Sequence, residues 1–192
     1  MIQSKSDYKY YQLADEIALG IYGISIVTRF MWYFYIKNWK FQRLLRKTEY
    51  YTNTHKTIVG KLFSFWLQYR LKIYGCKLGY TIPINVFGPG LALMHTGTII
   101  VSKEASIGKN CRCHACVNIG TGHGAPRIGD NCYIGPGAKI FNDIDIANNT
   151  SIGANAVVNK SFLDSNITIA GVPAKIVKNA SGFAGGGYRL FG

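Results

Sequence analysis

An apolar residue recurs at every sixth position through the second half of the chain. A period of six keeps the alternation of a β-strand, whereas residues six apart lie on different sides of an α-helix. Each unit is too short to bury its own apolar side, so successive units must stack into a solenoid. The pattern therefore predicts a mainly β fold, a parallel β-helix of short strands. The repeated positions form two runs, because the loop between Ile119 and Ile128 carries three extra residues. The first run is Val101, Ile107, Cys113 and Ile119, and the second is Ile128, Ile134, Ile140, Ile146, Ile152 and Val158.

The hexads are absent before residue 76, where aromatic and basic residues are frequent instead. Apolar residues at helical spacing predict three helices, over residues 8–19, 39–51 and 57–74. Around the apolar face of the second helix lie four cations, namely Lys40, Arg43, Arg46 and Lys47.

The change in pattern divides the chain into three parts. We expect a helical N-terminal region (1–75), a β-helix domain (76–178) and a glycine-rich flexible tail (179–192). Within the first part, residues 17–36 form an apolar stretch long enough to span a membrane, with Arg29 near its middle. A central arginine opposes insertion, so packing against a partner subunit or lying on a membrane surface is favoured.

The net charge of the chain is +13, and its basic excess lies at the N-terminal end. Twelve of the 22 Lys and Arg residues precede Cys76, against four acidic residues. This asymmetry predicts either an ordinary solvated face or an anionic partner. Among anionic partners we favour peripheral contact with the inner face of the cytoplasmic membrane, and we expect no nucleic acid.

The chain has five cysteines. An odd number without a secretory signal predicts a reducing, cytoplasmic location. Cys111, Cys113 and Cys132 occupy inward positions of the repeat, where a free cysteine acts as a small hydrophobe. The run Cys111-x-Cys113-His114-x-Cys116 does not have the usual spacing of zinc ligands, so no metal is expected.

Several segments between residues 79 and 178 resemble the hexapeptide acyltransferases, whose left-handed β-helix completes one coil with three hexads. Within that superfamily the chain is most similar to the serine O-acetyltransferase branch, including its relatives in polysaccharide gene clusters. The resemblance implies acetyl-CoA as co-substrate and a homotrimer, with a dimer of trimers as a further possibility. The segments are 82–83, 88–90, 95–97, 117–122, 125–131, 134–140, 152–158 and 170–175.

His95 is the expected general base, because acyl transfer to a hydroxyl needs a group that accepts its proton near neutral pH. The hexads running through Leu93 and Ile99 are out of frame by two residues with those that begin at Val101. His95 then falls at a corner of the solenoid, where a side chain points outward. The resemblance agrees, because the segment from Gly90 to Gly97 matches the one that carries the catalytic histidine.

The chain departs from serine acetyltransferases at positions that the family uses around this histidine. Tyr80 and Met94 stand where the family has aspartates, and Ala125 stands where it has a second histidine; the nearby loop holds His123 instead. We therefore predict an O-acetyltransferase whose acceptor is a sugar hydroxyl in polysaccharide biosynthesis. The alternatives are serine O-acetyltransferase itself and a non-catalytic β-helix scaffold.

The resemblance also implies where acetyl-CoA binds. The pantetheine arm is expected to run along the β-helix between subunits, against the backbone of Pro136, Gly137, Ala138 and Ala154. Lys175 and Lys178 are expected near the phosphates of the nucleotide end, where an ammonium group makes a good partner.

Overall fold

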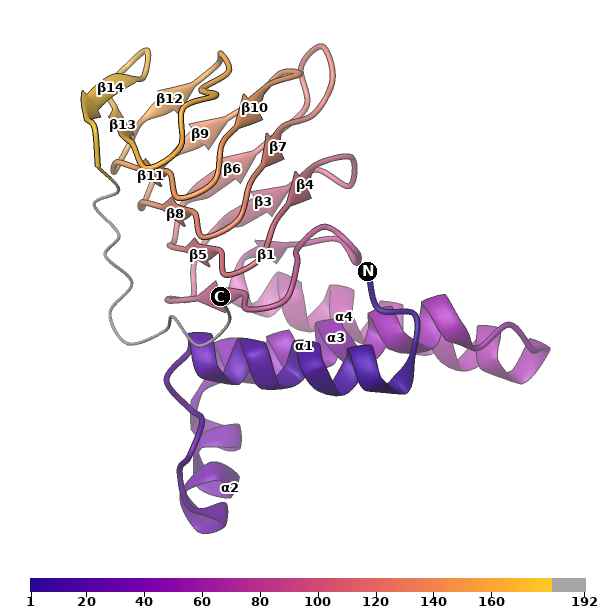
Figure 1. Cartoon of the computed structure of the whole chain (residues 1–192). Coiled ribbons are helices and arrows are strands. Elements are labelled where there is room, and N and C mark those ends of the chain that lie inside the picture. Colours follow the sequence, from indigo (N-terminus) through magenta and orange to yellow (C-terminus); the bar gives the residue numbers. More distant parts are fainter. Residues whose placement is uncertain (181–192) are drawn as a thin grey trace.

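A computed structural model describes residues 1–180 of the chain. Within this part, four helices lie beneath one end of a β-helix (Figure 1). The helices are α1 (Lys5–Ala18), α2 (Ile26–Tyr35), α3 (Lys37–Thr54) and α4 (Ile58–Leu78). The C-terminal part of the expected tail, residues 181–192, lies outside the described residues.

The β-helix consists of short strands that stack in parallel into three sheets. Successive strands turn from one sheet to the next and pair with strands one coil away, as in the pairing of Ile99 with Val117. The last strand is the exception, because it runs antiparallel to the strand before it. The predicted parallel β-helix is therefore confirmed. The strands are β1 (Tyr80–Thr81), β2 (Ala92–Leu93), β3 (Ile99–Val101), β4 (Ser106–Ile107), β5 (Arg112–Cys113), β6 (Val117–Ile119), β7 (Arg127–Ile128), β8 (Tyr133–Ile134), β9 (Lys139–Ile140), β10 (Asp145–Ile146), β11 (Ser151–Ile152), β12 (Val157–Val158), β13 (Thr168–Ala170) and β14 (Lys175–Lys178).

The sixth-position residues form the core of the solenoid. Ile134, Ile140 and Ile152 are fully buried, and every other residue of the two runs is at least 96% buried. The cysteines at inward positions pack among them as expected, and burial raises the pKa of the Cys113 thiol to about 12 and that of Cys132 to about 11. These thiols are inert core groups, because the thiolate is the reactive form.

The apolar stretch over residues 17–36 is not one continuous helix. α1 ends at Ala18, the chain turns through Gly20 and Gly23, both with positive φ, and α2 begins at Ile26. Among the described residues, no helix combines the length and the apolar character that crossing a membrane requires.

A polar stripe along α3 covers the first coil of the β-helix. The free edge of β2 would leave backbone groups without partners, and such edges must be covered. The side-chain amide of Gln42 covers this edge. Its nitrogen donates to the carbonyl of Leu91 (2.7 Å), and its oxygen accepts from the N–H of Leu93 (3.0 Å). Asn38 donates to the carbonyl of Leu93 (3.1 Å). The stripe therefore fixes the segment that leads to His95.

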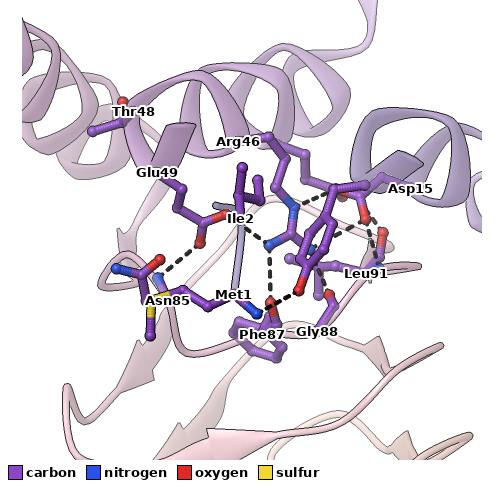
Figure 2. A network of polar contacts seen from close by, with 12 residues as sticks. Met1, Ile2, Asp15, Arg46, Thr48, Glu49, Asn85, Phe87, Gly88 and Leu91 are labelled. Carbon is purple, nitrogen blue, oxygen red and sulfur yellow. Dashed lines mark hydrogen bonds and ion pairs between the residues drawn. The ribbon is translucent and has the colours of Figure 1, made fainter. Parts of the chain in front are cut away.

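Arg46 lies further along the same stripe and is completely buried. Its guanidinium pairs with Asp15 (2.8 Å) and Glu49 (3.0 Å), and it donates to the carbonyls of Phe87 and Gly88 (Figure 2). Burial opposes its charge, but the two carboxylates outweigh burial and raise the pKa of Arg46. Helical spacing alone could not reveal this, because the residue faces backbone carbonyls and carboxylates rather than water.

Candidate active site

His95 lies on the corner that joins β2 to β3, and its side chain is exposed. This corner has five residues, 94–98, whereas the equivalent corner between β5 and β6 has three. The two extra residues explain the frame shift in the hexads, although they lie earlier than expected. Ile99 and Val101 both point into the core from β3. The longer corner carries His95 on the outer surface.

His114 lies beside His95 in the next coil, with 5.7 Å between the ring centroids. Tyr133 continues this column of rings, 5.1 Å from His114. Burial, the neighbouring His95 and then Arg112 lower the pKa of His114 from its ordinary value of 6.5. His114 is therefore neutral at pH 7 and offers either a donor or an acceptor next to His95. The sequence reasoning did not assign it a role.

Tyr80 touches the histidine segment through its backbone. The Tyr80 hydroxyl lies 2.8 Å from the carbonyl oxygen of His95 and 3.0 Å from the side-chain oxygen of Asn38, and it donates its proton to these acceptors. Burial raises the pKa of Tyr80, so the hydroxyl keeps that proton. Within the described residues, the ring nitrogens of His95 have no hydrogen-bond partner. Tyr80 thus holds the corner of the chain rather than the imidazole.

The other two candidate residues near the base occupy different places. Met94 is half-buried beside His95, and its N–H donates to the carbonyl of Cys113 (3.1 Å). His123 is exposed on the loop between β6 and β7, which is a different corner of the solenoid from the one that carries His95. A single protomer therefore does not bring His123 and His95 together.

Small residues continue the His95 corner from coil to coil. Backbone hydrogen bonds place His114, Gly135 and Gly153 at equivalent positions, each N–H donating to the coil above. A Cβ on Gly135 would meet the carbonyl of Ile152 at 2.7 Å, so this corner accepts no side chain there. Beyond the histidines, this corner of the solenoid therefore carries small residues in two successive coils. We call residues 135–137 and 153–154 the small-residue track.

Most of the residues expected to bind CoA lie on or beside this track. Pro136 and Ala154 are exposed, and Gly137 is half-buried with a φ of +78°. Ala138 differs, because its side chain is fully buried and its carbonyl accepts from Asn118 while its N–H donates to Gly135. Only its neighbours are free to meet a ligand from outside.

The two candidate lysines lie at the far end of the same sheet. Lys175 pairs with Ala170, directly above Gly153, and Lys178 pairs with Thr168; both lysines are exposed. Five strand spacings separate β2 from β14, which amounts to about 24 Å. In the part of the chain from residue 1 to 180, no group of three or more His, Cys, Asp or Glu residues is arranged to hold a metal ion.

Comparison with known families agrees with this architecture. Residues 125–160 match the family model for the bacterial transferase hexapeptide (six repeats). The serine acetyltransferase of Buchnera aphidicola (subsp. Acyrthosiphon pisum, strain APS) is 31% identical over 154 residues, which cover 77% of this chain and 53% of that protein. The serine acetyltransferase of Staphylococcus aureus (strain Mu50) is 36% identical over 96 residues, covering 47% and 45%. The chain thus spans about half the length of these relatives.

Solved structures extend the similarity across the helices. The serine acetyltransferase of Brucella abortus strain S19 superposes with a TM-score of 0.72 at 27% identity, covering 92% of this chain and 71% of that one. This chain is a hexapeptide-repeat protein of the serine acetyltransferase-like branch. Its fold class is accordingly the left-handed β-helix of that family.

Two further structures of this branch hold ligands that bear on the site. The serine acetyltransferase of Neisseria gonorrhoeae in complex with serine has a TM-score of 0.68 at 26% identity, covering 91% of this chain and 71% of that one. A serine acetyltransferase in complex with CoA also has a TM-score of 0.68, at 25% identity, covering 91% and 72%.

These serine acetyltransferases overturn the sugar hydroxyl as the expected acceptor. That expectation rested on the groups missing at Tyr80, Met94 and Ala125. The absence of family side chains says what is lost and does not specify a sugar. The structure shows that other polar groups occupy this region, because Tyr80 secures the corner and His114 lies beside His95.

Proposed function

We propose that this hexapeptide-repeat protein transfers the acetyl group of acetyl-CoA to the hydroxyl of serine. The observation that carries the proposal is the exposed imidazole of His95, next to a neutral His114, at the foot of the small-residue track. The named relatives and the serine and CoA complexes of its structural neighbours support the choice of substrates.

His95 acts as the general base of the proposed reaction. Its ring accepts the proton of the serine hydroxyl while the oxygen attacks the thioester carbonyl. The carbon–sulfur bond then breaks, and the same proton passes from the imidazolium of His95 to the departing thiolate. Because its pKa is lowered, His114 stays neutral and does not repel the imidazolium.

The small-residue track receives the pantetheine arm in this proposal. Gly135 and Gly153 leave the corner flat, so an extended chain can approach the backbone closely. Lys175 and Lys178 then meet the phosphates at the far end. The separation of about 24 Å along the sheet suits an elongated co-substrate that spans several coils.

A homotrimer is part of the proposal, and so is a cytoplasmic location. The track is open on the outside of one protomer, and a neighbouring β-helix would close it and bring in a histidine such as His123 from a different corner. The five free cysteines support a reducing compartment. We also propose peripheral contact with an anionic membrane, for which the surface is identified in the next subsection.

The decisive experiment measures release of CoA from acetyl-CoA with L-serine as acceptor. We expect turnover that falls by roughly 10²–10⁴-fold in His95→Asn, with an unchanged far-UV circular dichroism spectrum. D-serine and glycerol, which also carry hydroxyl groups, serve as acceptor controls. Equal turnover in His95→Asn and wild type would refute the role of His95. Absence of any turnover with L-serine would refute the proposed reaction and favour a non-catalytic β-helix scaffold.

A further inference from the structure

A hollow lies among the helices, and none of the four histidines lines it. It is an open groove of about 900 Å³ between α1, α2, α3 and α4. Among residues 1–180, six cations line it and no acidic side chain does. We call it the helical groove; its cations are Arg29, Lys40, Arg43, Lys47, Arg70 and Lys77.

Only part of this positive charge is neutralised within the chain. Arg29 and Arg43 both pair with the buried carboxylate of Glu16. Among residues 1–180, the other four cations of the groove have no carboxylate partner. Three of them instead lie over aromatic faces: Lys40 is 5.4 Å from the ring of Tyr33, Lys47 is 5.8 Å from that of Phe63, and Arg70 is 4.9 Å from that of Trp66. Such cations are held in place yet free to meet an anion.

Apolar side chains surround this charge and face water. None of the residues of α2 is buried, and Figure 1 shows this helix projecting away from the rest of the molecule. The first half of α4 adds a second exposed apolar face. Exposed apolar surfaces of this kind mark interaction sites. The side chains at least 63% exposed are Ile26, Val27, Phe30, Met31, Phe34 and Tyr35 on α2, and Ile58, Val59, Leu62 and Phe65 on α4.

We propose that the helical groove and the exposed face of α2 form a docking surface for an anionic membrane, with lipid phosphates in the groove and the apolar side chains among the acyl chains. This inference rests on the peripheral contact proposed above and not on acetyl transfer. α2 has ten residues and is about 15 Å long, so it lies along the interface instead of crossing the bilayer.

The charge distribution argues against a second copy of the chain as the occupant. A symmetric contact would bring two sets of six cations together. An asymmetric contact would need an acidic surface, but the chain has only nine acidic residues against 22 basic ones. Asp15, Glu16 and Glu49 are buried, and Asp143 and Asp145 already pair with Arg127.

The apolar component argues against a nucleic acid. A nucleic acid would meet the cations through its phosphates. However, it would leave the aliphatic side chains of α2, such as Ile26 and Val27, in water. A membrane surface satisfies both components, because cations bind headgroups while aromatic and aliphatic groups enter the interface.

The test is co-sedimentation of the full chain with vesicles. We expect binding to vesicles of phosphatidylglycerol and phosphatidylcholine, weakened by added salt, and little binding to phosphatidylcholine alone. The double variant Lys40→Gln/Lys47→Gln should bind about 25-fold more weakly, at about fivefold for each cation. Phe30→Ser should also weaken binding, because it removes an exposed apolar group.

The matched control is Lys103→Gln/Lys109→Gln, which removes the same charge from exposed positions on the β-helix. Equal losses in both double variants would reduce the effect to net charge and overturn the proposal. The proposal also fails if no vesicle binds, if an oligonucleotide displaces the vesicles, or if Lys40→Gln/Lys47→Gln changes the oligomeric state. Turnover with soluble L-serine is measured without vesicles, so failure of docking is distinguishable from failure of acetyl transfer.

Discussion

The rings of His95 and His114 lie 5.7 Å apart on adjacent coils of the β-helix. The backbone hydrogen bonds of the parallel sheet place His114 at the position equivalent to Met94, the residue before His95, so the two histidines lie on the same corner of successive coils. His95 is on a longer corner and reaches outward, whereas His114 is half-buried behind it. The pair thus combines an accessible base with a partner held in a fixed position.

We expect the ring of His114 to titrate below pH 6.5, because burial and the neighbouring His95 disfavour its charged form. The unfolded chain then binds this proton more readily than the folded one. The stability that neutral His114 contributes is therefore present above pH 6.5 and is lost as the pH falls through the lowered pKa. Histidine ring resonances measured by NMR across pH 4–8 give the midpoint.

The control for this titration is His95→Asn, which removes one of the causes of the shift. The midpoint of His114 should move up towards its ordinary value in the variant, while burial keeps it below that value. A midpoint at or above 6.5 in the wild type would contradict the expected environment of His114.

Tyr80→Phe tests whether the corner needs its hydrogen bond. The variant keeps the ring contact with Phe41 (5.0 Å between centroids) but leaves the oxygens of His95 and Asn38 without this donor. We expect the free energy of unfolding to fall by about 1–2 kcal/mol. We also expect kcat to fall on the order of tenfold, because a small displacement of a base is costly. Turnover at saturating substrates and urea unfolding measure the two effects, and unchanged kcat in a destabilised variant would reduce Tyr80 to a purely structural residue.

Arg46→Met should destabilise the protein strongly. The variant leaves the buried carboxylates of Asp15 and Glu49 and two backbone carbonyls without their partner. We expect the free energy of unfolding to fall by about 3–5 kcal/mol. The matched control is Arg127→Met, since Arg127 also joins two carboxylates but on the surface, where ion pairs contribute little. Denaturant unfolding compares the two, and similar losses would show that burial of the Arg46 network does not matter.

Ala154→Trp tests the small-residue track. Ala154 is exposed, so an indole side chain is accommodated there without strain. It would cover the proposed path of the pantetheine arm. The KM for acetyl-CoA should rise at least about tenfold, equivalent to the loss of about 1.4 kcal/mol of binding. Asn159→Trp places the same group at the next corner of that coil and should leave KM unchanged. A KM altered equally by both variants would rule out this path.

The β-helix was predictable because each hexad residue has one simple environment, the inside of the column. The frame of Ile134, Ile140 and Ile152 required no information beyond spacing. The position of His95 followed from the same frame, since a shift of two residues must enlarge a corner. A local sequence pattern was sufficient to predict the structure wherever the buried side chains pack against apolar neighbours.

The parts that could not be predicted depend on contacts distant in sequence. Gln42 and Arg46 read as polar positions on a helix, and they are buried because the first coil presents unpaired backbone groups to them. His114 falls at a corner like many others, and only the stacking of coils brings it to His95. Val59 and Leu62 lie at helical spacing among the apolar residues of α4, yet both are exposed because they are on its outward face. In each case the surface that a residue faces determines its burial and contacts, and residue spacing within one segment does not reveal that surface.

The number of coils along the small-residue track sets the distance between its two ends. Because each coil adds about 4.8 Å, the number of coils between His95 and Lys175 sets how long a molecule must be to touch both ends. Inserting or deleting one coil would shift that length by a fixed step while preserving every local turn. A fold built from repeats can therefore change the length of the molecule that it accommodates while the residues around His95 stay the same.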